Sequence, residues 1–224
     1  FLKGKKVRNL VKKPLMTTVY SLSRYGLQQS VEGWVREFGI SVTLEQTQYL
    51  GGRAKEAIDS TVKGATKAMN WIKEVTAIIT DRKMDVELLM PNGFYLVSSY
   101  RQPKSLQIRT KVLGDVYYTR FMERKEKGRI IRKKSINASV PNIVHALDAS
   151  ILFDFLEHYP ASKPISTVHD SIQFRGADAD IVYEGIRDSF VNIFAPNLLL
   201  DFKEQLEKQH GITLPDLPDL GTID

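Results

Sequence analysis

The feature that most constrains the fold is a long amphipathic run between residues 54 and 80. Apolar side chains recur there in steps of three and four residues, which places them on one face of a helix. These positions are Ile58, Val62, Ala65, Met69, Ile72, Val75 and Ile79. A helix over 54–80 would be about 40 Å long at 1.5 Å per residue. Because such a rod must bury its apolar face, the sequence predicts a brace that other elements cover.

The composition is that of a globular chain. Its 224 residues are 42% hydrophobic and 26% charged, so overall disorder is excluded. The chain has no cysteine, which excludes disulfides, a thiolate metal site and a cysteine nucleophile. No apolar run in the sequence reaches the roughly 18 residues that predict a membrane-spanning helix.

Three further segments have helical patterns. The first covers 7–38, in which Pro14 should start or kink a helix because it lacks a backbone N–H. The second covers 141–159, with Pro141 suited to the first turn, and the third covers 180–194. Residues 39–52 are predicted to be a connector.

Between these helices the pattern favours strands. Short strand pairs are predicted over 86–99, around the turn Pro91-Asn92-Gly93, and over 165–174. Residues 107–132 are predicted to form a long hairpin with a charged tip near 123–128. The predicted fold class is therefore α+β, mostly helical, with small antiparallel sheets.

Basic charge is concentrated in two segments. The net charge is +6, but residues 1–31 hold seven Lys or Arg and no acid, and residues 120–134 hold eight with two acids. The final stretch, 201–224, has six acids and two Lys. Concentrated basic segments favour contact with a polyanion such as nucleic acid. Two solvated surface faces would have the same composition.

Three places could carry chemistry. Arg8 and Lys12 are one helical turn apart and Tyr20 lies two turns further on, a spacing that could grip a triphosphate and contact its sugar. Asp170, at a turn between apolar strands, could hold Mg²⁺. His145 could hydrogen-bond a substrate hydroxyl. Taken singly, each also fits a structural role: a solvated face, a carboxylate that caps a turn, and a half-buried histidine.

Five motifs together resemble the single-subunit RNA polymerases of the phage and mitochondrial type. They follow that family's order over nearly the whole chain. They are Arg8-x-x-x-Lys12-x-x-x-Met16-Thr17-x-x-Tyr20, Ala68-Met69-Asn70-Trp71, Pro91-Asn92-Gly93, Pro141-Asn142-Ile143-Val144-His145 with Asp148 and Ser150, and Val168-His169-Asp170-Ser171. The resemblance implies an incomplete right-hand polymerase fold. Its parts would be fingers helices over 1–85, a sheet and a specificity-type hairpin over 86–140, and palm elements with the metal-binding turn over 141–224.

The resemblance also implies roles for single residues. Arg8 and Lys12 would bind the triphosphate of the incoming NTP, and Lys12 could protonate the departing pyrophosphate. Tyr20 and His145 would check the sugar, and Asp170 would hold catalytic Mg²⁺. The hairpin positions that correspond to base reading are Gln107, Arg109, Tyr117 and Thr119. Ser21 stands where many members of the family have glycine.

Two-metal nucleotidyl transfer needs a second carboxylate. The family's motif for that aspartate precedes the fingers helix, and the sequence contains no match to it. We therefore expect the chain to act with a DNA template, nascent RNA, NTPs and either a second polypeptide or a longer N-terminal portion. Alone it should not extend RNA. The expected setting is the cytoplasm of a phage-infected bacterium, with the mitochondrial matrix as the alternative.

Two other functions stay open on the sequence. A family A DNA polymerase shares the Arg-x-x-x-Lys and Tyr pattern and a His-Asp turn, but usually has an acid where this chain has Ser171. A non-catalytic, basic nucleic-acid-binding module could retain the same scaffold. Preference for dNTPs would favour the first, and an inert Asp170 would favour the second.

Overall fold

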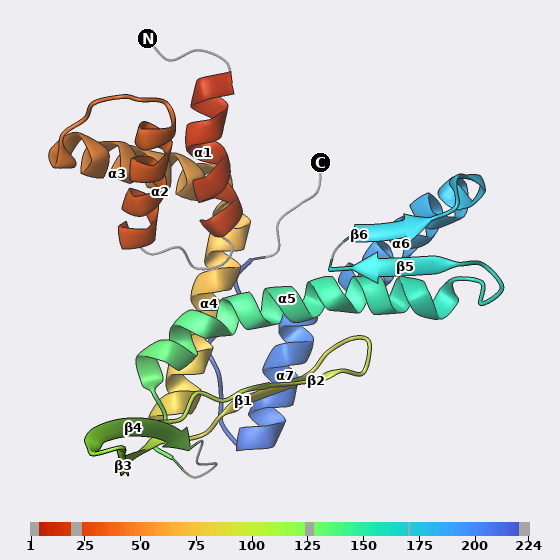
Figure 1. Cartoon of the computed structure of the whole chain (residues 1–224). Helices are drawn as coiled ribbons and strands as arrows, with labels where there is room; N and C mark the ends of the chain where they lie inside the picture. The colour runs from red at the N-terminus through yellow and green to blue at the C-terminus, as the bar shows by residue number, and fades with distance from the viewer. Residues whose placement is uncertain (1–4, 19–23, 124–127, 170, 220–224) are drawn as a thin grey trace.

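The chain folds into seven helices and three strand pairs within the part that the structure describes (Figure 1). This computed structural model describes residues 5–18, 24–123, 128–169 and 171–219. The helices are α1 Lys5–Thr18, α2 Arg24–Glu37, α3 Leu44–Thr61, α4 Lys63–Asp81, α5 Arg132–His158, α6 Ala179–Phe194 and α7 Leu198–His210. The strands are β1 Val86–Leu89, β2 Tyr95–Ser98, β3 Lys104–Val112, β4 Asp115–Glu123, β5 Ile165–Val168 and β6 Ser171–Phe174, and a 3₁₀ turn covers Gly176–Asp178. The predicted α+β class is confirmed.

The main core lies where α4, α5 and α7 meet the β1–β2 pair. Figure 1 shows α5 crossing α4, with α7 and the β1–β2 pair beneath it. The buried apolar residues of this core are Trp71, Ile72, Val75, Ile79, Val86, Leu88, Met90, Val140, Ile143, Ala146, Phe202, Leu206, Ile212 and Leu214. The indole Nε1 of Trp71 donates to the carbonyl O of Pro215 at 3.2 Å, which ties the irregular C-terminal stretch to α4.

Two smaller clusters support the ends of the molecule. Val31, Trp34 and Val35 of α2 are buried where α1, α2 and α3 pack together. Phe155 and Tyr159 are buried against Val182 of α6. The three helices α1 to α3 form a group at one end of α4, and α6 lies with the β5–β6 pair at the far end of α5 (Figure 1).

The predicted helix over 54–80 is two helices, so that prediction was wrong. α3 ends at Thr61 and α4 begins at Lys63, because Val62 leaves the helical region with φ −105° and ψ 49°. The hydroxyls of Ser60 and Thr61 both donate to the carbonyl O of Ala57, a local bond that competes with helix continuation. Of these two helices, only α4 contributes buried residues to the main core, as the apolar pattern from residue 69 onward predicted.

The connector predicted over 39–52 is also shorter than expected. α3 begins at Leu44, behind a capping box in which Thr43 and Gln46 exchange side-chain and backbone hydrogen bonds. Gly51 and Gly52 therefore lie inside α3 rather than before a helix. Pro14 likewise lies inside α1 and does not begin it.

α5 begins nine residues earlier than predicted, at Arg132 instead of Pro141. Pro141 lies within the helix, although its ring removes one backbone donor. Residues on both sides of it are buried, including Ser135, Ser139, Val140 and Ile143. This packing offsets the lost hydrogen bond, which the local sequence could not show.

All three strand pairs are antiparallel, as predicted. The long hairpin has its tip at Leu113-Gly114, where both residues have positive φ (51° and 96°), between the pair Val112 and Asp115. The charged tip predicted near 123–128 was therefore wrong, because β4 ends at Glu123, at the root of the hairpin. Within the described ranges, no helix is long and apolar enough to cross a membrane.

Candidate nucleotide-binding and metal-binding site

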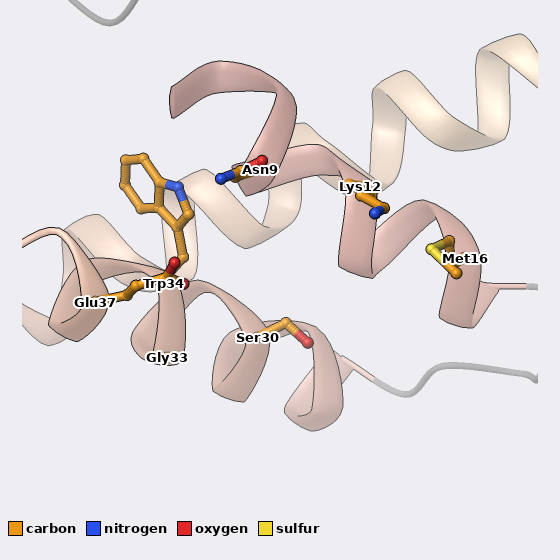
Figure 2. A pocket seen from close by; sticks show the side chains of 7 residues that line it. All are labelled: Asn9, Lys12, Met16, Ser30, Gly33, Trp34 and Glu37. Carbon is orange, nitrogen blue, oxygen red and sulfur yellow. The ribbon is translucent and has the colours of Figure 1, made fainter. Parts of the chain in front are cut away.

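The first predicted group lies on α1. Arg8 and Lys12 are both exposed, one turn apart on this helix. Lys12 lines a pocket of about 470 Å³ between α1 and α2, which Figure 2 shows from close by. The other lining residues are Asn9, Met16, Ser30, Gly33, Trp34 and Glu37. The pocket combines apolar walls from Met16 and Trp34 with the ammonium group of Lys12 and the carboxylate of Glu37.

A second pocket contains the predicted histidine of α5. His145 and Asp148, one turn apart on α5, line it together with His169 from the turn after β5. The remaining walls are apolar and come from α5, β6 and α6, and the volume is about 680 Å³. The tertiary fold thus brings residues of the fourth and fifth motifs into one cavity.

The turn after β5 is short and conformationally restricted. Val168 pairs with Ser171, which leaves His169 and Asp170 as the two connecting residues. His169 has φ 56°, the left-handed region that primed hairpin turns require at their first central position. From this turn His169 lines the pocket. Asp170 and Tyr20, both predicted site residues, lie outside the described residues.

Other motif residues have structural partners. Ser150 Oγ of α5 lies 3.0 Å from Asn92 Oδ1 in the turn between β1 and β2. Asn142 Nδ2 donates to Ser98 Oγ and to Tyr100 Oη, each at 3.1 Å. These contacts attach the β1–β2 pair to the same helix that carries His145. The Asn92 and Asn142 motifs thus help to position α5.

An ion pair fixes the start of α5 against the end of α4. Arg132 Nε lies 2.5 Å from Asp81 Oδ1, and Arg132 Nη2 lies 3.0 Å from Asp81 Oδ2. This bidentate hydrogen bonding lowers the pKa of the Asp81 carboxyl and raises the pKa of Arg132. At the other end of α5, a hydrogen bond to the carbonyl O of Asp154 raises the pKa of His158.

The two predicted groups occupy separate pockets. Lys12 belongs to the pocket on α1 and α2, and His145 to the pocket between α5 and α6. Among the residues that the structure describes, no three His, Asp or Glu side chains form a group that could hold a metal ion. Sequence reasoning missed Trp34 and Glu37, and it gave no role to Asp148, although its one-turn spacing from His145 was a usable signal.

The four predicted DNA-contacting residues lie on the exposed β3–β4 hairpin. Gln107 pairs with Arg120, Ile108 with Thr119, Arg109 with Tyr118, and Thr110 with Tyr117. Directly opposite residues in an antiparallel pair project to the same face, and neighbours along a strand alternate. Gln107 and Arg109 therefore share one face, whereas Tyr117 and Thr119 lie on the other.

The exposed helix α1 with Arg8 and Lys12, the long β3–β4 hairpin and the β5–β6 pair follow one another in the chain order that the motifs predicted. The family model described as DNA-dependent RNA polymerase matches residues 1–216. The chain belongs to this family, which confirms the resemblance drawn from its motifs.

Relatives come from phages and organelles. The chain is 28% identical over 206 residues to the DNA-directed RNA polymerase of Pseudomonas phage phiKMV, a match that covers 89% of the chain and 25% of the relative. It is 25% identical over 223 residues to the mitochondrial DNA-directed RNA polymerase 1 of Arabidopsis thaliana, with 97% and 22% covered. The mitochondrial enzyme of Mus musculus is 26% identical over 212 residues, with 93% and 17% covered. The chain spans a quarter or less of the length of these relatives.

Proposed function

We propose that this chain takes part in DNA-directed RNA synthesis, by transfer of a nucleotidyl group from an NTP to an RNA 3′ end. The observation that carries the proposal is the pocket that joins His145 and Asp148 of α5 with His169 of the β5–β6 turn. This pocket opens beside the turn that holds Asp170 in the sequence. A sugar hydroxyl bound there would have a histidine within reach and a metal-binding carboxylate next in the chain.

In this proposal α1 binds the triphosphate. The guanidinium of Arg8 forms bidentate hydrogen bonds to phosphate oxygens, and the ammonium of Lys12 donates a proton to the departing pyrophosphate. Both side chains are exposed on α1, as an open nucleotide site requires. Tyr20, two turns beyond Lys12 in the sequence, discriminates the sugar together with His145. Charge that develops on the phosphates in the transition state is thereby neutralised by groups already in place.

Mg²⁺ is the proposed cofactor. When bound, it would lower the pKa of the attacking 3′-hydroxyl and stabilise charge on the leaving oxygen. Carboxylate oxygens are the protein ligands that Mg²⁺ prefers, and Asp170 would supply one. We propose that a second aspartate comes from another polypeptide or from a further part of a longer chain.

The proposed assembly follows from these roles. The partners would be template DNA, nascent RNA, NTPs and the polypeptide that holds the second aspartate, in a phage-infected bacterial cytoplasm or, alternatively, in mitochondria. Residues 1–85 would act as fingers, 86–140 as sheet and hairpin, and 141–224 as palm. Native purification followed by intact-mass analysis tests this assembly. A stoichiometric second protein supports a split enzyme, a single longer polypeptide supports a conventional one, and the 25.5 kDa chain alone contradicts an obligate subunit.

The activity is tested by extension of an RNA primer on a DNA template with the purified assembly. Asp170→Ala should abolish Mg²⁺-dependent incorporation of NTPs, because the metal loses a ligand. Asp188→Ala, which removes an exposed carboxylate from α6, is the matched control and should retain it. Extension by the isolated chain that depends on Asp170 would contradict the need for a second aspartate.

The same assay separates the alternatives. Clear preference for dNTPs would indicate a family A DNA polymerase, and activity that survives Asp170→Ala would indicate a binding module on the same scaffold. Tyr20→Phe should relax discrimination between NTPs and dNTPs. Unchanged discrimination would remove Tyr20 from its proposed role.

A further inference from the structure

Helix α6 carries a stripe of exposed aromatic side chains. Tyr183, Phe190 and Phe194 are seven and four residues apart, a spacing that places them on one face of the helix. They are 59%, 54% and 40% exposed. The rings of Phe190 and Phe194 lie against each other, with their centroids 4.7 Å apart. Neighbouring exposed aromatic side chains of this kind are typical of a surface that contacts another molecule.

One end of this stripe borders a pocket of about 360 Å³ between α4, α5 and the start of α7, which we call the apolar pocket. Phe194 forms part of its wall. Among the described residues that line the pocket, Asn197 is the only polar one. Its Oδ1 already accepts a hydrogen bond from the N–H of Leu200 at 3.2 Å, at the start of α7. The described wall therefore offers no charged group to a phosphate or a nucleotide.

The apolar pocket adjoins the pocket that contains the candidate site. Val144 of α5 lines the apolar pocket, and the next residue, His145, lines the other. On α6, Phe190 lines the His145 pocket, and Phe194 lines the apolar one. The two pockets thus meet across the Phe190–Phe194 pair. A molecule that fills the apolar pocket would lie directly beside the candidate site.

The proposed function requires a second polypeptide portion at this place. The two metal ions of a nucleotidyl-transfer site are about 3.5–4 Å apart, so the second aspartate must reach the mouth of the His145 pocket. The chain spans a quarter or less of the length of its relatives, so most of such an enzyme must be accommodated against it. An exposed apolar surface beside the site is where that portion would bury apolar side chains of its own.

We propose that the Phe190–Phe194 pair and the apolar pocket are the docking surface for the polypeptide portion that supplies the second aspartate. The proposal rests on the proposed function and names the interface that it needs. The occupant is an apolar segment of that portion, with aliphatic or aromatic side chains, because a charged group in this pocket would lose water without gaining a partner. Docking there would bring the second aspartate close to His145 and the turn that follows β5.

The test places a photoreactive benzoyl-phenylalanine at position 194 of the chain within the purified polymerase assembly. Because Phe194 is itself aromatic and partly exposed, the label should be tolerated. After irradiation, mass mapping of the cross-linked peptides identifies what lies against the pocket. We expect an apolar peptide from outside residues 1–224. Cross-links that stay within 1–224, or that join the chain to nucleic acid, would overturn the proposal.

Phe153 is the matched control position for the label. It is an exposed phenylalanine of α5 that lines neither pocket. It follows Val144 by nine residues, about two and a half turns, and therefore lies on the opposite side of the helix. The label at 153 should not cross-link to the peptide captured from 194. Equal capture of that peptide from both positions would show that the apolar pocket is not a preferred surface, which would overturn the proposal.

A charge in the pocket wall provides a second measurement. Ala65→Asp adds a carboxylate at an exposed wall position in the first turn of α4, where an acid is favourable to the helix. It should lower the yield of the cross-link from 194 at least about tenfold, because docking would bury an unpaired charge. Ala57→Asp, at an exposed position of α3 that lines neither pocket, should leave the yield unchanged. An unchanged yield in Ala65→Asp would contradict docking in the apolar pocket.

Failure of the proposed function is detected separately. A cross-link from position 194 to a peptide outside 1–224, in an assembly that does not extend an RNA primer with NTPs, would support the docking surface and overturn the proposed function. Primer extension by the labelled assembly without that cross-link would overturn the docking surface alone. A cross-link between two copies of residues 1–224 would show that self-association covers the apolar pocket, which would also overturn the proposal.

Discussion

The β1–β2 and β3–β4 hairpins have the same topology but differ in burial. In the β1–β2 pair, Val86 and Leu88 are buried, as is Met90 directly after β1. In the β3–β4 pair every strand residue is exposed, although its strands are more than twice as long. Both pairs have complete antiparallel registers. Local strand pairing is thus common to both, and the surroundings make the difference.

Side-chain contacts explain why only the β1–β2 pair, which we call the docked hairpin, packs against the rest of the molecule. Gln205 of α7 brackets the backbone of Leu89: its Oε1 accepts from the Leu89 N–H at 2.8 Å, and its Nε2 donates to the Leu89 carbonyl at 3.1 Å. Asn92 reaches Ser150 of α5 at the turn. At the root of the β3–β4 hairpin, Arg101 instead forms an ion pair with Asp85. An isolated two-stranded hairpin is marginally stable in water, so the docked pair should contribute far more to the free energy of unfolding.

The largest expected effect comes from truncating a core residue of the docked hairpin. Leu88→Ala should lower the free energy of unfolding by about 2–5 kcal/mol, because Leu88 is 1% exposed. Leu106→Ala in β3, where the leucine is 51% exposed, should change it by less than about 0.5 kcal/mol. Urea denaturation of the purified protein measures both. Similar losses would mean that β3 is also buried in solution.

A second pair of changes tests whether α6 packs as tightly against α5 as the docked hairpin packs against the core. A Cβ on Gly185 of α6 would lie 2.9 Å from the buried ring of Phe155, so Gly185→Ala should cost about 1–3 kcal/mol. Gly52→Ala in α3 meets nothing within 4 Å and should stabilise by about 0.4–1 kcal/mol. The two variants should shift the midpoint of thermal unfolding in opposite directions. A neutral Gly185→Ala would show that α6 can move away from α5.

A third change isolates the polar anchor of the docked hairpin. Ser150→Ala and Asn92→Ala should each cost about 0.5–1.5 kcal/mol, since each removes one partner of the 3.0 Å contact. The double variant should cost less than the sum, because both remove the same interaction. Thr110→Ala in β3, whose hydroxyl makes only a 3.5 Å exposed contact, is the control and should be neutral. If the losses of the two single variants add up in the double variant, the contact between Ser150 and Asn92 does not contribute to stability.

The smallest expected effect is a pH dependence at the docked hairpin. Burial lowers the pKa of His210, while nearby Glu87 of β1 opposes that shift. As the pH falls through about 6.5, the unfolded histidine gains a proton that the folded one resists, so stability decreases. His210→Gln should therefore reduce the loss of stability between pH 7.5 and 5.5, measured as the urea midpoint.

His158 should show the opposite sign and serves as the comparison for His210. Its hydrogen bond to the Asp154 carbonyl raises the pKa, so its contribution is complete below the unfolded pKa and is lost as the pH rises through the folded pKa. His158→Gln should enlarge the acid loss. If both variants change the pH dependence of the urea midpoint in the same direction, burial is not the main influence on the pKa of His210.

Much of the local structure was predictable from residues close together in the sequence. Asn92-Gly93 predicted the β1–β2 turn, and the apolar spacing from Met69 to Ile79 predicted the buried face of α4. The tip of the long hairpin was predicted at the charged residues after Glu123, whereas the turn lies at Leu113-Gly114, where glycine readily adopts a positive φ. The start of α5 was misplaced at Pro141, because burial of the flanking serines depends on distant partners.

The sequence by itself determined the family, the candidate residues and the turn of the β1–β2 hairpin, since motifs, periodicity and turn chemistry depend on near neighbours along the chain. The tertiary structure alone decided that His145 and His169 share one pocket, that Lys12 lies in another, and that Gln107 and Thr119 face opposite ways. It also decided which hairpin is buried. The physical reason is that burial, register and the meeting of distant side chains depend on how helices and strands pack in three dimensions.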